Sequence, residues 1–146
     1  MPHLFHTAPQ ANRYYAWFEA LHTRVDLLLL GSRSESAFGA VVVSVRECLA
    51  AIERMGNRFS RDSELSRAVA EAYRMPVLLS PELYALLARC LQAHCDTGGL
   101  FDITVCSPDF QPGFIRFVEL TADGALRLHR PGMVLDLSGV LKGYAL

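Results

Sequence analysis

Residues 135–146, LDLSGVLKGYAL, place an aspartate, a bend of small residues and a lysine close together. An apolar strand that runs into Ser138 and Gly139 and then into a helix leaves free backbone N–H groups at the helix start, a general way to bind phosphate. Lys142 follows three residues after Gly139 and adds a positive charge. The G-x-x-x-x-G-K-[ST] loop is absent, so the stretch taken alone is more typical of an ordinary strand-to-helix turn.

A second candidate is DTGGLFDITV, residues 96–105, in which two glycines precede an aspartate. The glycines allow the backbone to approach another group closely, and Asp102 is expected at the start of a strand. An ordinary helix end followed by a strand also explains the pattern. The stretch gains interest from a second aspartate, Asp136, which also lies near a glycine bend.

A third candidate is NRFSRDSELSR, residues 57–67, in which three arginines and several polar residues surround Phe59. An aromatic platform with hydrogen-bond donors beside it suits a planar heterocycle attached to a phosphate. The alternative is a solvated loop and helix start, which usually explains such a run of charge.

The histidines and cysteines form no recognisable metal or nucleophile motif. His94 is followed by Cys95, and the two cannot point the same way on a helix. The four cysteines lack C-x-x-C spacing and are expected to be free thiols, buried or partly buried. H-E-x-x-H, Ser-His-Asp and Gly-rich dinucleotide patterns are absent, which argues against simple hydrolase and Rossmann interpretations.

Composition is that of one globular domain without a strongly charged partner. The 146 residues are 51% hydrophobic and carry a net charge of −1, so neither nucleic acid nor a membrane surface is expected to bind. The longest apolar run is four leucines, too short for a membrane span. With no signal peptide or lipobox visible, a cytoplasmic location is expected.

The elements that must position these residues follow from the periodicity. One or two strands are expected over 13–30, an amphipathic helix from Glu35 to a stop at Gly56, and a short helix over 64–72 capped by Asp62 or Ser63. A short strand at 75–79 and a helix from Ser80 to about Gly98 come next. Further strands are expected at 101–105, 114–120, 125–129 and 133–137, the last with Asp136 facing away from its apolar neighbours.

These elements predict an α+β fold: one domain over residues 1–146, with helices packed on one face of a largely antiparallel sheet. Four stretches, in this order, resemble the N-terminal half of the ApbE family, the FAD:protein FMN transferases. They are ALHTRVDLLL, RFSRDSELSR, SPELYALLARCLQAHCDTGGLFDITV and MVLDLSGVLKGYA, and the resemblance runs from about Ala20 to the last residue.

The resemblance implies an activity. Family members bind FAD with Mg²⁺, cleave its pyrophosphate, and transfer the FMN part to a threonine or serine hydroxyl of an acceptor protein, releasing AMP. It assigns no catalytic residue in this chain, and it implies a metal position at the backbone oxygen of Gly139. The implied flavin- or FAD-contacting positions are Leu21, Phe59, Leu100, Phe101, Asp102, Asp136 and Lys142.

The chain also departs from the family pattern. His22 stands where the family usually has glycine, and Ala68 and Val69 follow SELSR where leucine and asparagine are usual. The ligands that complete the family's metal site lie in a second half, so the domain is expected to be incomplete at its C-terminus. Two alternatives are an FAD- or nucleotide-binding module without turnover and an α+β fragment that self-associates through exposed apolar surface.

Mutation of Asp136 to alanine is expected to weaken flavin binding more than it reduces stability. The basis is the expected position of Asp136 at a strand end on the polar face, where a carboxylate contributes little to the core.

Overall fold

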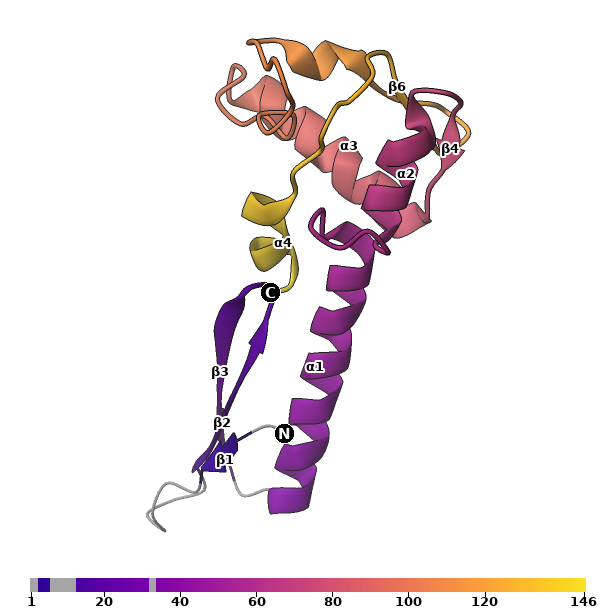
Figure 1. Ribbon diagram of the computed structural model, residues 1–146. Coiled ribbons are helices and arrows are strands. Elements are labelled where there is room, and N and C mark those ends of the chain that lie inside the picture. The colour runs from indigo at the N-terminus through magenta and orange to yellow at the C-terminus, as the bar shows by residue number, and fades with distance from the viewer. Residues whose placement is uncertain (1–2, 6–12, 32–33) are drawn as a thin grey trace. The chain divides into compact units, whose positions relative to one another are not determined.

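The computed structural model describes residues 3–5, 13–31 and 34–146 (Figure 1). The elements are β1 (His3–Phe5), β2 (Arg13–Ala20), β3 (Thr23–Leu30), α1 (Glu35–Gly56), α2 (Glu64–Ala72), β4 (Val77–Leu78), α3 (Pro81–Asp96), the 3₁₀-helix η1 (Phe114–Phe117), β5 (Val118–Leu120), β6 (Ala125–Leu128) and α4 (Ser138–Tyr144). The α+β class expected from the sequence is confirmed. The antiparallel strands form two sheets, in the orders β1-β2-β3 and β4-β6-β5.

Contacts within the chain divide it into two compact units, Met1–Glu53 and Arg54–Tyr144, and the boundary falls inside α1. In the first unit β2 and β3 pair along their whole length, from Arg13 opposite Leu30 to Ala20 opposite Thr23. Of the one or two strands expected over 13–30, two are present. The ring of Tyr14 stacks on that of Phe38 in α1, with ring centroids 5.2 Å apart.

The turn between β2 and β3 is left-handed at two consecutive residues, Leu21 (φ +51°) and His22 (φ +55°). Positive φ at both central positions is the geometry of a type I′ hairpin turn, which favours asparagine and glycine. The turn is held in place because the Leu21 backbone N–H donates to Glu53 Oε1 at 2.7 Å. This backbone conformation gives a physical reason for glycine at the position of His22, since glycine adopts positive φ without steric cost.

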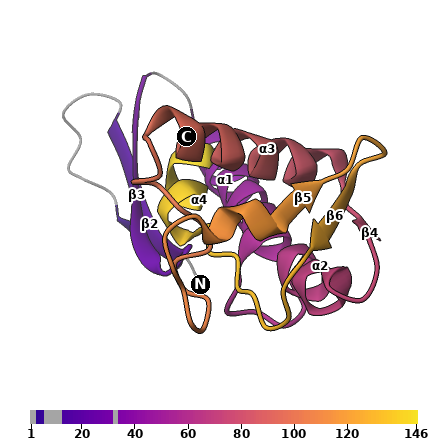
Figure 2. The same ribbon diagram turned by 90° about the horizontal axis from the view of Figure 1, so that it is seen from above.

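In the second unit, three short strands, the helices α2, α3 and α4 and the 3₁₀-helix η1 enclose an apolar core. β6 is the central strand, with Val77 of β4 opposite Leu126 and Val118 of β5 opposite Leu128. α2 lies beside β6 (Figure 2). The largest fully buried apolar side chains of this unit are Leu65, Leu83, Leu87, Ile103, Leu126, Leu128, Leu135 and Leu137.

The starts of α2 and α3 agree with the sequence because each depends on a local cap. Ser63 Oγ accepts from Ser66 N at 3.1 Å, and Ser80 Oγ accepts from Leu83 N at 3.2 Å. Glu64 joins the two helix starts, since its carboxylate oxygens accept from Ser80 N at 2.6 Å and from Ser80 Oγ at 2.9 Å. The sequence did not indicate this last contact, because its partners lie in different elements.

Removal of the α2 cap gives a first test of the fold. The Ser63 side chain is fully buried, so Ser63→Ala leaves the partly buried Ser66 N–H without its acceptor. We expect the free energy of unfolding to fall by about 1 kcal/mol, measured by urea denaturation. Ser63→Thr keeps the hydroxyl and is the matched control; equal stability of the alanine variant and the parent would contradict the cap assignment.

The prediction of a strand at 101–105 is wrong. Asp102 Oδ1 accepts from the backbone N–H of Thr104 at 2.8 Å and from its hydroxyl at 2.6 Å, and Val105 N–H donates to Asp102 O at 3.4 Å. An aspartate that satisfies the backbone two residues on makes a turn, in competition with a strand ladder.

Two further strand predictions are corrected. Residues 114–117 form η1, because Gly113 turns the chain with φ +81° and the rings of Phe114 and Phe117 then pack edge to face at 5.6 Å. Residues 133–137 are extended but pair with no strand among the described residues. The Ser107 hydroxyl bonds both backbone groups of Val134, and Ile103 O accepts from Asp136 N.

The expected alternation in this last segment is nevertheless present. Met133, Leu135 and Leu137 are buried, and Asp136 lies between the last two on a more open side.

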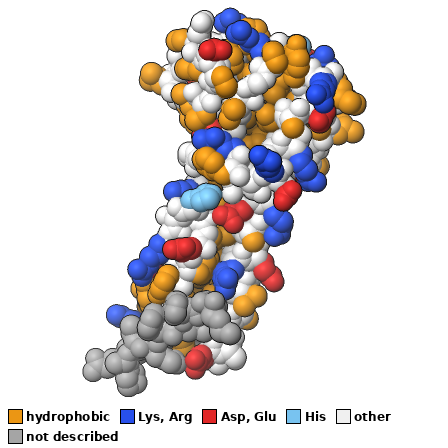
Figure 3. Space-filling view, in the orientation of Figure 1, with side chains coloured by type: hydrophobic (Ala, Val, Ile, Leu, Met, Phe, Trp, Pro, Cys, Tyr) orange, Lys and Arg blue, Asp and Glu red, His pale blue; other side chains and the backbone are white. Residues whose placement is uncertain are grey.

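On the face shown in Figure 3, basic, acidic and hydrophobic side chains are interspersed. No helix among the described residues is long and apolar enough to cross a membrane.

Candidate functional site

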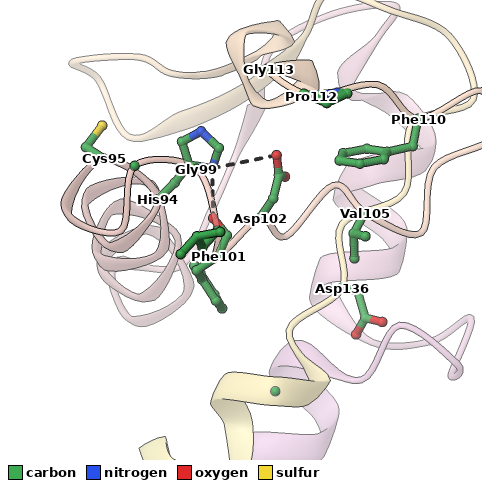
Figure 4. A pocket seen from close by; sticks show the side chains of 13 residues that line it. His94, Cys95, Gly99, Phe101, Asp102, Val105, Phe110, Pro112, Gly113 and Asp136 are labelled. Carbon is green, nitrogen blue, oxygen red and sulfur yellow. Dashed lines mark hydrogen bonds and ion pairs between the residues drawn. The ribbon is translucent and has the colours of Figure 1, made fainter.

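A pocket of about 830 Å³ opens in the second unit beside the C-terminal end of α3. Three segments line it: the end of α3 with the loop that follows, residues 110–113, and the segment that leads into α4. Figure 4 shows the rings of Phe101 and Phe110 and the carboxylates of Asp102 and Asp136 around this space. The pocket therefore brings together two of the three stretches that the sequence singled out.

The end of α3 is built to turn the chain back toward the helix. Gly98 and Gly99 have φ of +61° and +87°, and Gly99 N–H donates to His94 O at 2.8 Å. This is the left-handed helix end that glycine favours. Thr97 Oγ1 accepts from Phe101 N at 3.0 Å, so Phe101 and Asp102 return alongside the last turn of α3.

The side chain of His94 contacts both Phe101 and Asp102. Its Nδ1 lies 2.7 Å from Phe101 O and 3.6 Å from Asp102 Oδ2. Because a carbonyl oxygen only accepts, Nδ1 is the protonated nitrogen of this contact. The ring is largely covered, with its side chain 15% exposed, and Figure 4 shows Nε2 turned away from both contacts.

Asp136 sits at the meeting point of three segments. Oδ1 accepts from Ser138 N at 2.8 Å, while Oδ2 accepts from the Cys106 thiol at 3.2 Å and lies 2.9 Å from Arg58 Nε. Arg58 Nε has no hydrogen bond, so its contact with Asp136 is an ion pair without a directed N–H bond. The Asp136 side chain is only 16% exposed.

These contacts shift two titrations. Burial by itself would raise the pKa of Asp136, but hydrogen bonds from Ser138 and Cys106 and the charge of Arg58 outweigh it and hold the pKa below its ordinary value. The hydrogen bond to Asp136, with burial and the Asp136 charge, raises the pKa of the Cys106 thiol against the opposing effect of Arg58. The Asp136 carboxylate is therefore charged near neutral pH and Cys106 is its donor.

Arg58 also connects the site to the third stretch. Its guanidinium carbon lies 4.0 Å from the centroid of the Phe59 ring, a cation–π contact, and the ring itself is 61% exposed. The Ser66 hydroxyl donates to Arg58 O at 3.3 Å and anchors the loop to α2. Phe59 is thus an exposed aromatic platform one residue away from the Asp136 ion pair.

The structure distributes the sequence-predicted positions as follows. Leu100, Phe101, Asp102, Asp136 and Gly139 all line the pocket, and the Leu100 side chain is almost fully exposed. The exposed Lys142 lies on α4 outside the pocket lining. Phe59 is not a lining residue either, but its ring contacts Arg58, the ion-pair partner of Asp136. Leu21 belongs to the other unit, where its side chain is buried.

The described residues do not make a complete magnesium site. Among them, no three His, Cys, Asp or Glu side chains lie close enough together to hold a metal ion. Magnesium takes about six oxygens in near-octahedral array, more than the Asp136 carboxylate and the Gly139 backbone oxygen supply.

All four cysteines are free as expected, but only Cys90 is buried, and Cys48, Cys95 and Cys106 are exposed.

Sequence reasoning missed three residues of the site: His94, Arg58 and Cys106. His94 joins no metal motif, although the Thr-Gly-Gly helix end after it signals that the chain turns back there. The sequence pattern marks Arg58 only as one of three arginines around Phe59, without a partner for it. Its partner, and that of Cys106, is far away in the sequence, and no local pattern indicates such pairs.

Comparison with solved structures shows the class of this fold. The flavin transferase ApbE from Vibrio cholerae is 17% identical, with a TM-score of 0.74 over 93% of this chain and 51% of that one. Its histidine-to-glycine variant is 18% identical, with a TM-score of 0.76 over 92% of this chain and 54% of that one. The ApbE protein from Thermotoga maritima is 18% identical, with a TM-score of 0.75 over 92% of this chain and 50% of that one. The chain therefore has the fold of about half of each of these proteins.

The ApbE family model matches residues 21–109, well over half of the chain. The chain belongs to the ApbE family. A comparison with curated protein sequences found no match.

Proposed function

We propose that the protein acts in FMN transfer, moving the FMN moiety of FAD to a threonine or serine hydroxyl of an acceptor protein. The observation that carries the proposal is the pocket, where Phe101, Asp102 and Asp136 meet in a member of the ApbE family. In the proposal residues 1–146 are one ApbE-like domain that spans about half of the solved family members it matches.

The proposed reaction is a phosphoryl-type transfer. The acceptor hydroxyl oxygen bonds to the phosphorus of the FMN half, the pyrophosphate bond breaks, AMP leaves with the bridging oxygen, and the hydroxyl proton is released. Such reactions depend mainly on positioning and on neutralising charge. Arg58 supplies a positive charge held in place by Asp136, which lines the pocket, and the exposed Lys142 on α4, outside the lining, supplies another.

The ligand-contacting positions of the proposal are Leu21, Phe59, Leu100, Phe101, Asp102, Asp136 and Lys142. Magnesium dependence enters it through family membership alone, with the Gly139 backbone oxygen as the described contribution. The pocket is open and its walls are largely apolar, as expected for a site that holds part of a flat heterocyclic ligand.

The direct test is covalent flavin on an acceptor. Incubation with FAD, Mg²⁺ and a peptide that carries a threonine or serine should add the mass of one FMN moiety to the peptide, with release of AMP. Omission of FAD is the blank, and a peptide with alanine in place of the hydroxyl residue is the control. If neither this chain nor one extended by the second half of a full-length relative forms covalent flavin, the transferase proposal is wrong.

A second candidate is FAD or nucleotide binding without turnover. It is favoured by one observation: the metal ligands present among the described residues do not complete a magnesium site. Flavin fluorescence distinguishes the candidates from an inert fold, since both predict a change on titration of FAD. Binding without transfer by the extended chain would select this candidate.

Phe59→Ala tests the aromatic platform. The ring is mostly exposed, so we expect little change in stability but roughly a five- to tenfold weaker FAD affinity from the loss of stacking. Tyr73→Ala removes another half-exposed ring, just after α2, and is the matched control. Equal FAD affinity of Phe59→Ala and the parent would remove Phe59 from the proposal.

A further inference from the structure

We propose that His94 is a specificity-determining residue of the pocket, whose Nε2 accepts a hydrogen bond from the exocyclic amino group of an adenine ring. The inference takes FAD as the ligand from the proposed function. It adds which half of FAD enters the pocket and which side chain recognises it.

The hydrogen-bonding role of His94 follows from its contacts. Nδ1 donates to Phe101 O at 2.7 Å and has Asp102 Oδ2 at 3.6 Å, so the ring is fixed in orientation and its proton is on Nδ1. In a neutral imidazole with that tautomer, Nε2 is an acceptor. His94 lines the pocket, and Figure 4 shows Nε2 turned away from the two groups that hold the ring.

The Gly98-Gly99 turn leaves room at this edge of the ring. A Cβ added at Gly99 would lie 3.5 Å from His94 Cε1 and 3.6 Å from Nε2, in ordinary contact with the edge that a ligand must reach. Gly99 has φ +87°, which glycine adopts without strain. The glycine therefore both turns the chain and keeps the acceptor uncovered.

The charged and imidazole groups of the pocket are acceptors. They are the carboxylates of Asp102 and Asp136 together with His94 Nε2. Such a pocket favours a ligand edge that carries donors. Adenine presents an amino group with two N–H donors, whereas the polar edge of the isoalloxazine ring presents two carbonyl oxygens beside one N–H.

The pocket also has aromatic walls for a flat ring, and Phe59 offers a separate exposed platform beyond the Asp136–Arg58 pair. One dinucleotide has two rings joined by a pyrophosphate, so two ring sites on either side of an arginine match its chemistry. We therefore assign the adenine ring to the His94 pocket and leave the Phe59 platform to the flavin.

The experiment compares ligands that differ in one group. Binding of AMP and of purine riboside 5′-monophosphate, which has hydrogen in place of the amino group, is measured by calorimetry at pH 8, where an ordinary imidazole is neutral. The parent protein should prefer AMP by roughly three- to tenfold. His94→Phe should abolish that preference and lower the affinity for FAD by a similar factor. His94→Gln should restore part of the preference for AMP through its amide oxygen.

Two controls locate the effect. FMN lacks the adenosine half, so its affinity should be the same in His94→Phe and in the parent; a matching loss for FMN would overturn the assignment of the pocket to adenine. His129→Phe changes a histidine that pairs with Glu119 on the surface and should leave the AMP preference unchanged.

The outcomes separate this inference from the proposed function. FAD binding with equal affinity for AMP and purine riboside monophosphate in the parent protein, a result that needs no variant, overturns the role of His94 and leaves the transferase proposal standing. A His94-dependent preference for AMP without any FMN transfer supports His94 and counts against the transferase. Absence of binding by FAD and AMP alike overturns both.

Discussion

Asp136→Ala is expected to lower the free energy of unfolding by about 2–4 kcal/mol and to weaken FAD binding as well. Removal of the carboxylate leaves Arg58 without its charge partner, at a site where both side chains are mostly covered. It also leaves the Ser138 N–H and the Cys106 thiol without their acceptor. Chemical denaturation followed by circular dichroism measures the first effect and FAD titration the second.

The structure corrects the premise that this carboxylate contributes little to stability, because it joins three segments of the second unit. Asp136→Asn removes the charge but keeps one amide oxygen, which can accept from Ser138 or from Cys106 but not from both, so its loss of stability should be smaller than that of the alanine variant. The double variant Arg58→Met, Asp136→Asn should lose less free energy of unfolding than the two single variants lose in sum. Additive losses would show that the ion pair does not stabilise the fold.

The same ion pair sets a pH dependence. The folded-state pKa of Asp136 is lowered from 3.8, so its stabilisation is fully present above that value and is lost as the pH falls through the lower folded-state pKa. The acid side of the stability curve should therefore be flatter for Asp136→Asn than for the parent.

Asp102→Ala is the second change with a large expected effect. The buried Thr104 has a backbone N–H and a hydroxyl that both donate to Asp102 Oδ1, and the alanine leaves both without a partner inside the protein. We expect a loss of about 2–3 kcal/mol in the free energy of unfolding. FAD affinity should fall too, because the turn holds Phe101 and Asp102 at the pocket.

Asp102→Asn separates geometry from charge, since its amide oxygen can still accept from Thr104. A stability within about 1 kcal/mol of the parent is expected for it. If the asparagine variant is destabilised as much as the alanine variant, the carboxylate charge rather than the turn accounts for the effect.

The helices could be predicted from sequence, and the short strands could not. Ser63, Ser80 and Pro81 act on neighbouring residues, so their patterns carry nearly all the information needed to start a helix. The segments at 101–105 and 133–137 have strand-like composition, but side chains satisfy their backbone groups. The Asp102 side chain accepts from the backbone N–H of Thr104 within a turn, and the Ser107 side chain bonds the backbone of Val134, which only the fold brings near it.

The site was predictable only as three separate stretches. Glycines marked the places where Asp102 and Asp136 approach a common pocket, and the exposed ring of Phe59 was expected as a platform. The connections between them are side-chain contacts across the fold, such as Arg58 with Asp136. No periodicity records such contacts.

The thiol of Cys106 has a practical consequence for following this site. While it donates to Asp136 its pKa is raised, and a thiol that stays protonated reacts slowly with alkylating reagents. Any ligand that takes over the Asp136 carboxylate removes that hydrogen bond and should make alkylation of Cys106 faster. Mapping labelled cysteines by mass spectrometry, with the exposed Cys48 and Cys95 as internal standards, would then report occupancy in the unmutated protein.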